Sequence, residues 1–191
     1  MIGLLGGSFD PIHHGHLLAA QSLYESLELS AVWLVPAGQQ PFKAGMHAAS
    51  AEDRAAMVGL AIEGVPHFKL ERMELERPGP SYTVDTLQAL RSRLPGQRFA
   101  LLVGADAAQE LPQWHQADAL PGLAEVIAFG RGGQLAGPHP LVSRQVEVPV
   151  VQISATEIRR RVAGGRSIRY WLPEAVAQYI ARRGLYRKTE A

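Results

Sequence analysis

The stretch IGLLGGSFDPIHHGH (residues 2–16) decides the fold that the sequence predicts. It begins as a near-continuous apolar run, passes through Gly6 and Gly7, and reaches an amphipathic pattern that extends over residues 15–29. Strands that are apolar throughout are expected where both faces of a parallel sheet are covered. The two glycines lack a Cβ, so a ligand can approach the backbone closely there. The stretch therefore predicts a strand, a ligand-binding turn and a helix.

The rest of the chain repeats this alternation of strands and helices. Strands are predicted at 31–36, 67–71, 98–104, 124–131 and 146–154, and helices at 50–64, 83–94 and 173–184. The pattern is typical of βαβ units, so the predicted fold class is α/β with a doubly wound, mainly parallel sheet. We expect one domain spanning 1–191, with a C-terminal helical portion from about residue 154. Ligands bind beyond the carboxyl ends of the strands in such sheets, so site residues are expected in the loops that follow strands.

Three histidines stand at the predicted start of the first helix, at positions 13, 14 and 16. His13 and His16 are three residues apart, so they share one side of the first turn and can both donate to one phosphate. A helix N-terminus carries a partial positive charge and favours anions. Metal binding by the pair would need further ligands, and ordinary helix-start histidines would not need the glycine context. The spacing favours phosphate binding over these two alternatives.

The composition narrows the classes of function. The chain has no cysteine, which excludes disulfides, thiolate metal sites and cysteine nucleophiles and fits a reducing compartment. No signal peptide or membrane-length apolar run is visible, so we expect a soluble, cytoplasmic protein without a membrane partner. The net charge of +1 argues against a nucleic-acid partner, although residues 151–191 carry 9 Lys and Arg against 3 Asp and Glu. Whether copies of the chain form a homo-oligomer is left open.

A second stretch, ISATEIRRR (153–161), lies where this basic excess begins. Ser154 and Glu157 have the S-x-x-E spacing of a capping box, which is a structural role. The capped helix N-terminus is again an anion site, and the guanidinium of Arg159 in the second turn can grip a polyphosphate. The two roles are compatible, although a cap side chain bonded to its own helix is less free for a ligand.

The first stretch resembles the motif [ST]-F-D-P-x-H-x-G-H of the nucleotidyltransferase superfamily, whose H-x-G-H element is shared with class I aminoacyl-tRNA synthetases. The second resembles the superfamily's I-S-[ST]-[ST]-x-[IV]-R element, with Ala155 in place of a usual serine or threonine. This resemblance implies a Rossmann-like nucleotidyltransferase fold, and adenylyl or cytidylyl transfer without a covalent enzyme intermediate. It implies that His13, His16 and Arg159 are catalytic, whereas His14 falls on a variable position. The implied ATP-binding residues in the two motifs are Gly6, Gly7, Ser8, Phe9, Gly15, Ser154 and Thr156.

Two further stretches narrow the resemblance. GPSYTVDTL (79–87) and LLVGADAAQELPQWHQADAL (101–120) resemble segments of the bacterial nicotinate-mononucleotide adenylyltransferases, whose members carry G-P-S-Y-T-x-D-T-L and G-x-D…L-x-x-W in this order. The resemblance covers nearly the whole chain. It implies that Trp114 stacks on the nicotinate ring and that donors around Thr83 receive the ring carboxylate. The implied mononucleotide-binding residues are Ser81, Tyr82, Thr83, Trp114 and Arg131.

The same resemblance implies further contacts on the ATP side. Gly104 and Asp106 would line the nucleotide site after a strand end, where a carboxylate can hold ribose hydroxyls. The loop VPAGQQPFK (35–43) departs from the family's Pro-Asn-x-x-Pro-Pro-His-Lys, since the asparagine is absent and Phe42 stands in place of the histidine. Lys43 remains, and it could reach a terminal phosphate.

The resemblance implies ATP and nicotinate mononucleotide as substrates, nicotinate adenine dinucleotide and pyrophosphate as products, and Mg²⁺ bound through the ATP phosphates rather than by protein side chains. Two alternatives keep the fold but change the acceptor to nicotinamide mononucleotide or phosphopantetheine. A third is a non-catalytic nucleotide-binding sensor. The Trp114 turn and the 79–87 segment argue against phosphopantetheine. The presence of both motif histidines and of Arg159 argues against the sensor.

Overall fold

The computed structural model describes residues 1–39, 47–131, 139–149 and 151–187. Its centre is a six-stranded sheet of order β3-β2-β1-β4-β5-β6 in which every neighbouring pair is parallel. The strands are β1 (Ile2–Gly7), β2 (Ala31–Pro36), β3 (Phe68–Leu70), β4 (Phe99–Gly104), β5 (Glu125–Arg131) and β6 (Arg144–Val148). This is the strand order of a doubly wound Rossmann sheet. The predicted α/β class is confirmed, and the sheet is wholly parallel.

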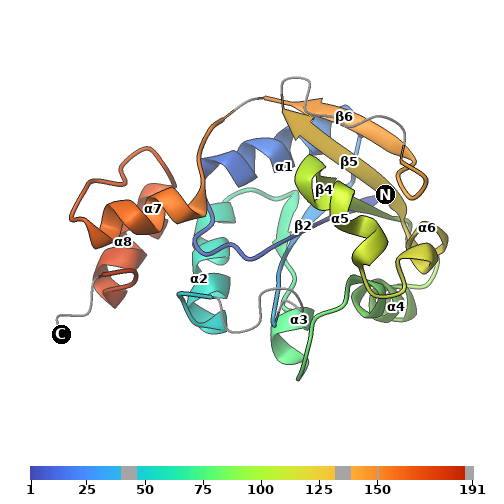
Figure 1. Ribbon diagram of the computed structural model, residues 1–191, viewed down its shortest axis with the longest axis horizontal. Helices are drawn as coiled ribbons and strands as arrows, with labels where there is room; N and C mark the ends of the chain where they lie inside the picture. Colours follow the sequence, from blue (N-terminus) through green and yellow to red (C-terminus); the bar gives the residue numbers. More distant parts are fainter. Residues whose placement is uncertain (40–46, 132–138, 150, 188–191) are drawn as a thin grey trace.

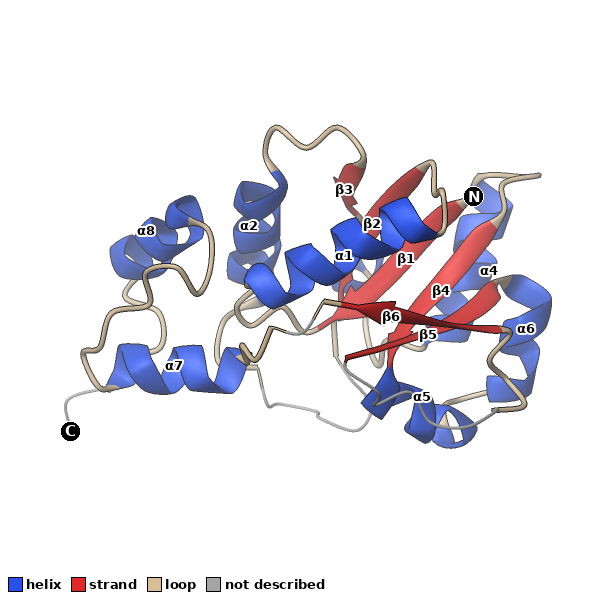
Figure 2. Ribbon diagram, turned by 90° about the horizontal axis from the view of Figure 1, so that it is seen from above, coloured by secondary structure: helices blue, strands red, loops and turns tan. Residues whose placement is uncertain are grey.

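Helices cover both faces of the sheet, with α1 and α2 on one side and α4 and α6 on the other (Figure 2). The α-helices are α1 (His14–Ser26), α2 (Ala51–Ile62), α3 (Met73–Glu76), α4 (Thr83–Arg93), α5 (Ala105–Glu110), α6 (Leu120–Leu123), α7 (Ala155–Ala163) and α8 (Glu174–Arg183). Two 3₁₀ turns, η2 (Leu111–Gln113) and η3 (Ala117–Ala119), follow α5. Within the described ranges, no helix is long and apolar enough to cross a bilayer.

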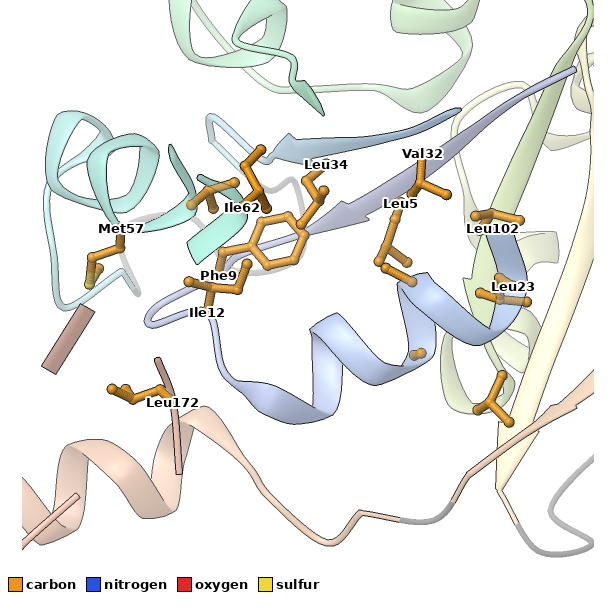
Figure 3. Packing of buried hydrophobic residues seen from close by; sticks show 14 of the residues in the cluster. Leu5, Phe9, Ile12, Leu23, Val32, Leu34, Met57, Ile62, Leu102 and Leu172 are labelled. Atoms are coloured by element: carbon orange, nitrogen blue, oxygen red, sulfur yellow. The ribbon is translucent and has the colours of Figure 1, made fainter. Parts of the chain in front are cut away.

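The side chains of β1 alternate between two hydrophobic clusters. Leu5 packs into the cluster under α1 and α2, whereas Leu4 packs into the cluster under α4. Both side chains are buried, so the strand is apolar at successive positions, as a central parallel strand should be. In Figure 3, Phe9 and Ile12 from the turn after β1 lie in the first cluster beside Leu34. The first motif is therefore anchored in the core at its apolar positions.

The last two helices, α7 and α8, lie at the same end of the molecule, and α8 packs against α2 (Figure 1). Polar contacts join α8 to α2 at Asp53, whose carboxylate accepts hydrogen bonds from the Tyr179 hydroxyl at 2.8 Å and the Arg183 guanidinium at 3.0 Å. Burial alone would raise the pKa of Asp53, but the bonds from Ser50, Tyr179 and Arg183 outweigh it and hold the pKa below its ordinary value. The carboxylate therefore stays ionised as the link between the two helices.

The predicted strand at 146–154 is wrong at both ends, because β6 spans Arg144–Val148. Pro149 follows at once and has no N–H for a further ladder bond, so pairing stops there. The strand also begins earlier than its apolar residues suggest, because Arg144 and Gln145 are exposed at the edge of the sheet. The chain then reaches Ser154, which begins α7.

Candidate active site

The candidate site lies at the carboxyl ends of β1 and β4, two strands that are neighbours in the sheet but not in the sequence. This is the point where the strand order reverses, which is where doubly wound folds bind ligands. Gly7 ends β1 and Gly104 ends β4, so two of the predicted nucleotide-contacting glycines flank this point. A Cβ added to the exposed Gly6 would meet no atom within 4 Å. The backbone there is open to an approaching ligand.

The turn after β1 is held from behind by Phe9. Its ring is 1% exposed and lies in the core, while its backbone adopts a left-handed φ of 47°. A non-glycine residue in that region is uncommon and is held there by its surroundings. Phe9 therefore offers a ligand its backbone only, and the neighbouring Ser8 is half-buried.

His13 and His16 stack on each other at the start of α1. Their ring centroids are 3.7 Å apart with an interplanar angle of 22°, and the Phe9 ring meets His16 edge-on at 5.1 Å. The His13 backbone N–H donates to Nδ1 of His16 at 3.3 Å. Because Nδ1 accepts this bond, a neutral His16 carries its proton on Nε2. The pair thus presents an N–H donor at a helix N-terminus.

Gly15 is needed between the two histidines for a reason of packing. A Cβ at this position would lie 3.0 Å from Nδ1 and 3.1 Å from Cε1 of His13, closer than ordinary contact distance. The same Cβ would lie 3.8 Å from the carbonyl oxygen of Ile153. The start of α1 therefore lies beside the second motif, although the two are far apart in the sequence.

The second motif reaches the first through Arg159. One guanidinium nitrogen donates to the carbonyl oxygen of Asp10 at 2.7 Å, and the other donates to the hydroxyl of Thr156 at 3.2 Å. Ser154 caps α7 by accepting the Glu157 N–H at 3.2 Å, as the capping-box spacing predicts. Ser154 and Thr156 are both exposed beside this contact. The structure thus brings Arg159 onto the turn that carries the histidines.

The segment predicted to bind the mononucleotide forms the start of α4, with Tyr82 at the N-cap and Thr83 in the first turn. The Ser81 hydroxyl accepts the Gly38 N–H at 3.2 Å and also bonds the carboxyl group of Glu74. Burial raises the pKa of Glu74, and hydrogen bonds from Thr86 and Ser81 offset only part of that effect. Ser81 therefore has protein partners, which tie the start of α4 to Gly38 and Glu74.

Aromatic side chains gather near this segment. The ring of Tyr82 lies 4.3 Å from that of His115, which directly follows Trp114. Trp114 is partly buried and packs against the cluster under α4. The structure therefore brings the start of α4 and the tryptophan turn together. Sequence reasoning passed over His115, because an exposed histidine in a polar turn gives no local signal.

The remaining predicted residues take no part in the contacts described above. Asp106 is exposed in the first turn of α5, directly after the strand end at Gly104. Arg131 is the last residue of β5, and only its place in that strand is described. Lys43 and Phe42 lie outside the described residues. Among the described residues, no group of three His, Cys, Asp or Glu side chains is placed to hold a metal ion.

Sequence reasoning also missed a set of buried polar residues behind the motif turn. Asp10 is 2% exposed and Arg54 is 1% exposed, and the Arg54 guanidinium donates to the Ser8 carbonyl at 2.8 Å. The hydroxyl of Tyr186, near the end of the chain, donates to Asp10 at 2.7 Å. Asp10 stands inside the quoted motif, but nothing in the local pattern connects it to a tyrosine 176 residues away.

The cytidylyltransferase-like family matches residues 4–161 of the chain, a range that includes the stacked histidine pair and the arginine bonded to the same turn. A probable nicotinate-nucleotide adenylyltransferase of Thermomicrobium roseum is 44% identical over 199 aligned residues, covering 100% of this chain and 93% of that protein. A probable nicotinate-nucleotide adenylyltransferase of Thermus thermophilus is 48% identical over 186 residues, covering 97% of this chain and 99% of that protein. The chain belongs to the nicotinate-nucleotide adenylyltransferase family.

Solved structures share the fold at lower identity. The Plasmodium falciparum nicotinic acid mononucleotide adenylyltransferase complexed with NaAD superposes with a TM-score of 0.78 at 19% identity, covering 97% of this chain and 96% of that one. The same enzyme complexed with APC gives a TM-score of 0.74 over the same shares. The sheet and its helices are thus those of known nucleotidyltransferases.

Proposed function

We propose that the protein transfers the adenylyl group of ATP to nicotinate mononucleotide, which yields nicotinate adenine dinucleotide and pyrophosphate. The observation that carries this proposal is the meeting of the two motifs at one turn. The stacked pair His13 and His16 begins α1, and Arg159 hydrogen-bonds the carbonyl of Asp10 three residues before the pair. Such a constellation suits phosphoryl chemistry, which depends on positioning and charge stabilisation rather than on a protein nucleophile.

In the proposed reaction, a phosphate oxygen of the mononucleotide attacks the α-phosphorus of ATP in line. The new P–O bond forms as the bond from the α-phosphorus to the bridging oxygen of the β-phosphate breaks, and that electron pair leaves with pyrophosphate. The attacking phosphate monoester is largely ionised near neutral pH, so the protein need not supply a base. Nε2–H of His16, fixed by the bond at Nδ1, would donate to the α-phosphoryl oxygens, with His13 beside it.

Arg159 and the exposed hydroxyls of Ser154 and Thr156 would hold the leaving polyphosphate. A guanidinium has five N–H donors, and the bonds to Asp10 and Thr156 leave others available for phosphate oxygens. Gly6 and Gly7 would let the nucleotide lie close to the backbone, and Gly104 and Asp106 would line its ribose side. The glycines lie at the carboxyl ends of β1 and β4, and α7 reaches the turn after β1 through the bond from Arg159 to the Asp10 carbonyl.

The acceptor would lie toward α4. Trp114 is only partly buried, so one part of its ring can stack on the nicotinate ring while another stays in the core. The hydroxyl and amide of Thr83 stand in the first turn of α4, where a helix N-terminus favours the ring carboxylate. Tyr82, Ser81 and Arg131 complete the proposed acceptor side, with Ser81 acting partly through its bond to Glu74.

We propose that Mg²⁺ enters with ATP rather than as a resident ion. Mg²⁺ prefers oxygen ligands and often binds through substrate phosphates, whereas this site offers imidazole and guanidinium donors, which suit the phosphates themselves. When bound, the ion would neutralise charge on the leaving pyrophosphate. His13, His16 and Arg159 would then hold the phosphate oxygens that the ion does not.

A pyrophosphate-release assay with several acceptors tests the proposal. ATP would be supplied with nicotinate mononucleotide, nicotinamide mononucleotide or phosphopantetheine in parallel reactions. We expect the highest kcat/KM with the nicotinate compound. Equal values for nicotinate and nicotinamide mononucleotides would overturn the acceptor while keeping adenylyl transfer. Absence of pyrophosphate with every acceptor would favour the non-catalytic sensor.

A further inference from the structure

Asp10, in the turn of the first motif, joins three separate parts of the chain. One carboxylate oxygen accepts the Ala48 N–H at 2.7 Å, and the other accepts the Ala49 N–H at 3.2 Å and the Tyr186 hydroxyl at 2.7 Å. Its backbone carbonyl accepts the Arg159 guanidinium. We call Asp10, Ala48, Ala49 and Tyr186 the Asp10 network. It ties the motif turn to the segment before α2 and to the last described turn of the chain.

Tyr186 reaches this network from an unfavourable backbone conformation. Its φ is +62°, in the left-handed region, which is a true outlier for so bulky a residue. Such a conformation persists only where the surroundings fix it. Here the hydroxyl bonds Asp10 and also contacts the sulfur of Met57 at 3.9 Å. Burial and the bond to Asp10 raise the pKa of Tyr186, so the hydroxyl remains a donor across the working pH range.

A buried arginine balances the charge of the network. Arg54 is 1% exposed, faces Asp10 and Tyr186, and donates to the Ser8 carbonyl at 2.8 Å. Burial lowers its pKa and the Asp10 carboxylate offsets part of that effect. Two guanidinium groups therefore hydrogen-bond carbonyl oxygens of the motif turn. Arg54 donates to the carbonyl of Ser8, and Arg159 donates to the carbonyl of Asp10. Asp10 therefore accepts the Arg159 guanidinium through its backbone carbonyl while its side chain belongs to the network.

We propose that Tyr186 is a positioning residue for adenylyl transfer: its hydroxyl orients Asp10, and Asp10 fixes the turn on which Arg159 rests. This rests on the proposed function. The residue acts through Asp10 and touches no substrate. Tyr186 holds the carboxylate between its two backbone donors, and the carbonyl of the same residue is then presented to the Arg159 guanidinium.

The molecule offers a matched control for this proposal. The Tyr179 hydroxyl donates to Asp53 at 2.8 Å. Like the bond from Tyr186 to Asp10, this is a tyrosine–aspartate bond from the C-terminal part of the chain, and it ends on α2. The side-chain partners of Asp53 are Ser50, Tyr179 and Arg183, all of them outside the motif turn. Tyr186→Phe and Tyr179→Phe each remove one hydroxyl of this kind. A merely structural role predicts the same outcome for both.

The test measures kcat, both KM values and the thermal midpoint for the two variants. In Tyr186→Phe we expect kcat to fall about tenfold, the scale of one hydrogen bond to a charged group, with the KM for the mononucleotide unchanged. The thermal midpoint should fall by a similar amount in both variants, because each loses one partly buried hydrogen bond. In Tyr179→Phe, however, we expect kcat to remain at the wild-type value. Equal kcat values for the two variants would overturn the proposal.

Amide hydrogen exchange gives a readout that does not depend on the reaction. Tyr186→Phe should speed exchange at residues 48 and 49 about tenfold, and Tyr179→Phe should leave it unchanged. If wild-type protein lacked adenylyl transfer while this exchange pattern held, the proposed function would fail and the network would stand. Unchanged exchange in Tyr186→Phe would refute the network itself.

Asp10→Asn provides a second route should Tyr186→Phe fail to fold. An amide keeps the size of the side chain but places an NH₂ group against one of the backbone donors. We expect a similar loss of kcat in Asp10→Asn, a measurement that needs no Tyr186 variant, and wild-type kcat would overturn the proposal. Where both single variants fold, the double variant Tyr186→Phe/Asp10→Asn should lose little more than either. Losses that multiply would show that the two residues act independently, which contradicts the proposal.

Discussion

Replacing Gly15 by alanine separates the packing of the histidine pair from the stability of the fold. The added Cβ would lie 3.0 Å from Nδ1 of His13, so the ring must shift by a few tenths of an ångström. His13 is 4% exposed and stacked at 3.7 Å on His16, so the shift is passed to its partner. Since a misplacement of about 1 Å can cost about 10²-fold in rate, we expect kcat to fall about tenfold.

The free energy of unfolding should change far less. Alanine favours a helix over glycine by up to about 1 kcal/mol, and a strained His13 rotamer costs about as much, so the two effects nearly cancel. Gly59→Ala is the matched control, because Gly59 lies inside α2 and its added Cβ would meet nothing within 4 Å. It should stabilise the protein by about 1 kcal/mol with unchanged kcat. Urea unfolding and steady-state kinetics measure both effects, and wild-type kcat in Gly15→Ala would refute this reasoning.

Three further predictions concern the supports of the site. Burial raises the pKa of Glu74 above its ordinary 4.5, so the native state holds the proton more tightly than the unfolded state does. The free energy of unfolding should therefore fall as pH rises from about 4.5 through the folded-state pKa. Glu74→Gln should abolish that fall, and parallel pH curves for the two proteins would contradict it. Gly38→Ala would force a Cβ into the Glu74 carbonyl oxygen, so we expect a loss of about 1–3 kcal/mol in urea unfolding; an unchanged midpoint would count against this contact. Ser154→Ala should cost about 1 kcal/mol in the same measurement, through loss of the α7 cap, and a cost near zero would mean that water replaces the cap.

Most of the fold could be predicted from the sequence, because the strands carry their own local pattern. The apolar runs at 31–36 and 98–104 became β2 and β4 to within one residue, since both faces of each strand are buried. The edge strand β6 could not be placed in this way. Its outer residues, such as Arg144, are exposed and polar, and its end is set by Pro149 rather than by loss of apolar character.

The candidate site likewise has features that a local sequence pattern could predict and contacts that it could not. The turn at His13 and His16 and the cap at Ser154 are local, so spacing alone could indicate them. The contact between Arg159 and the Asp10 carbonyl spans 149 residues and leaves no trace in either segment. The bond from Tyr186 to Asp10 is longer still in sequence and depends on a strained backbone near the end of the chain. Contacts of this kind follow from the packed fold and not from any local pattern.

The central claim is that the histidine pair at the β1–α1 turn stabilises adenylyl transfer to nicotinate mononucleotide. The most direct test is the single-turnover rate of nicotinate adenine dinucleotide formation, with protein and ATP in saturating excess over the mononucleotide, compared between wild-type protein and His16→Ala. We expect the rate to fall by about 10²-fold or more, as loss of a donor to the developing charge requires. A His16→Ala rate close to that of wild type would contradict the claim.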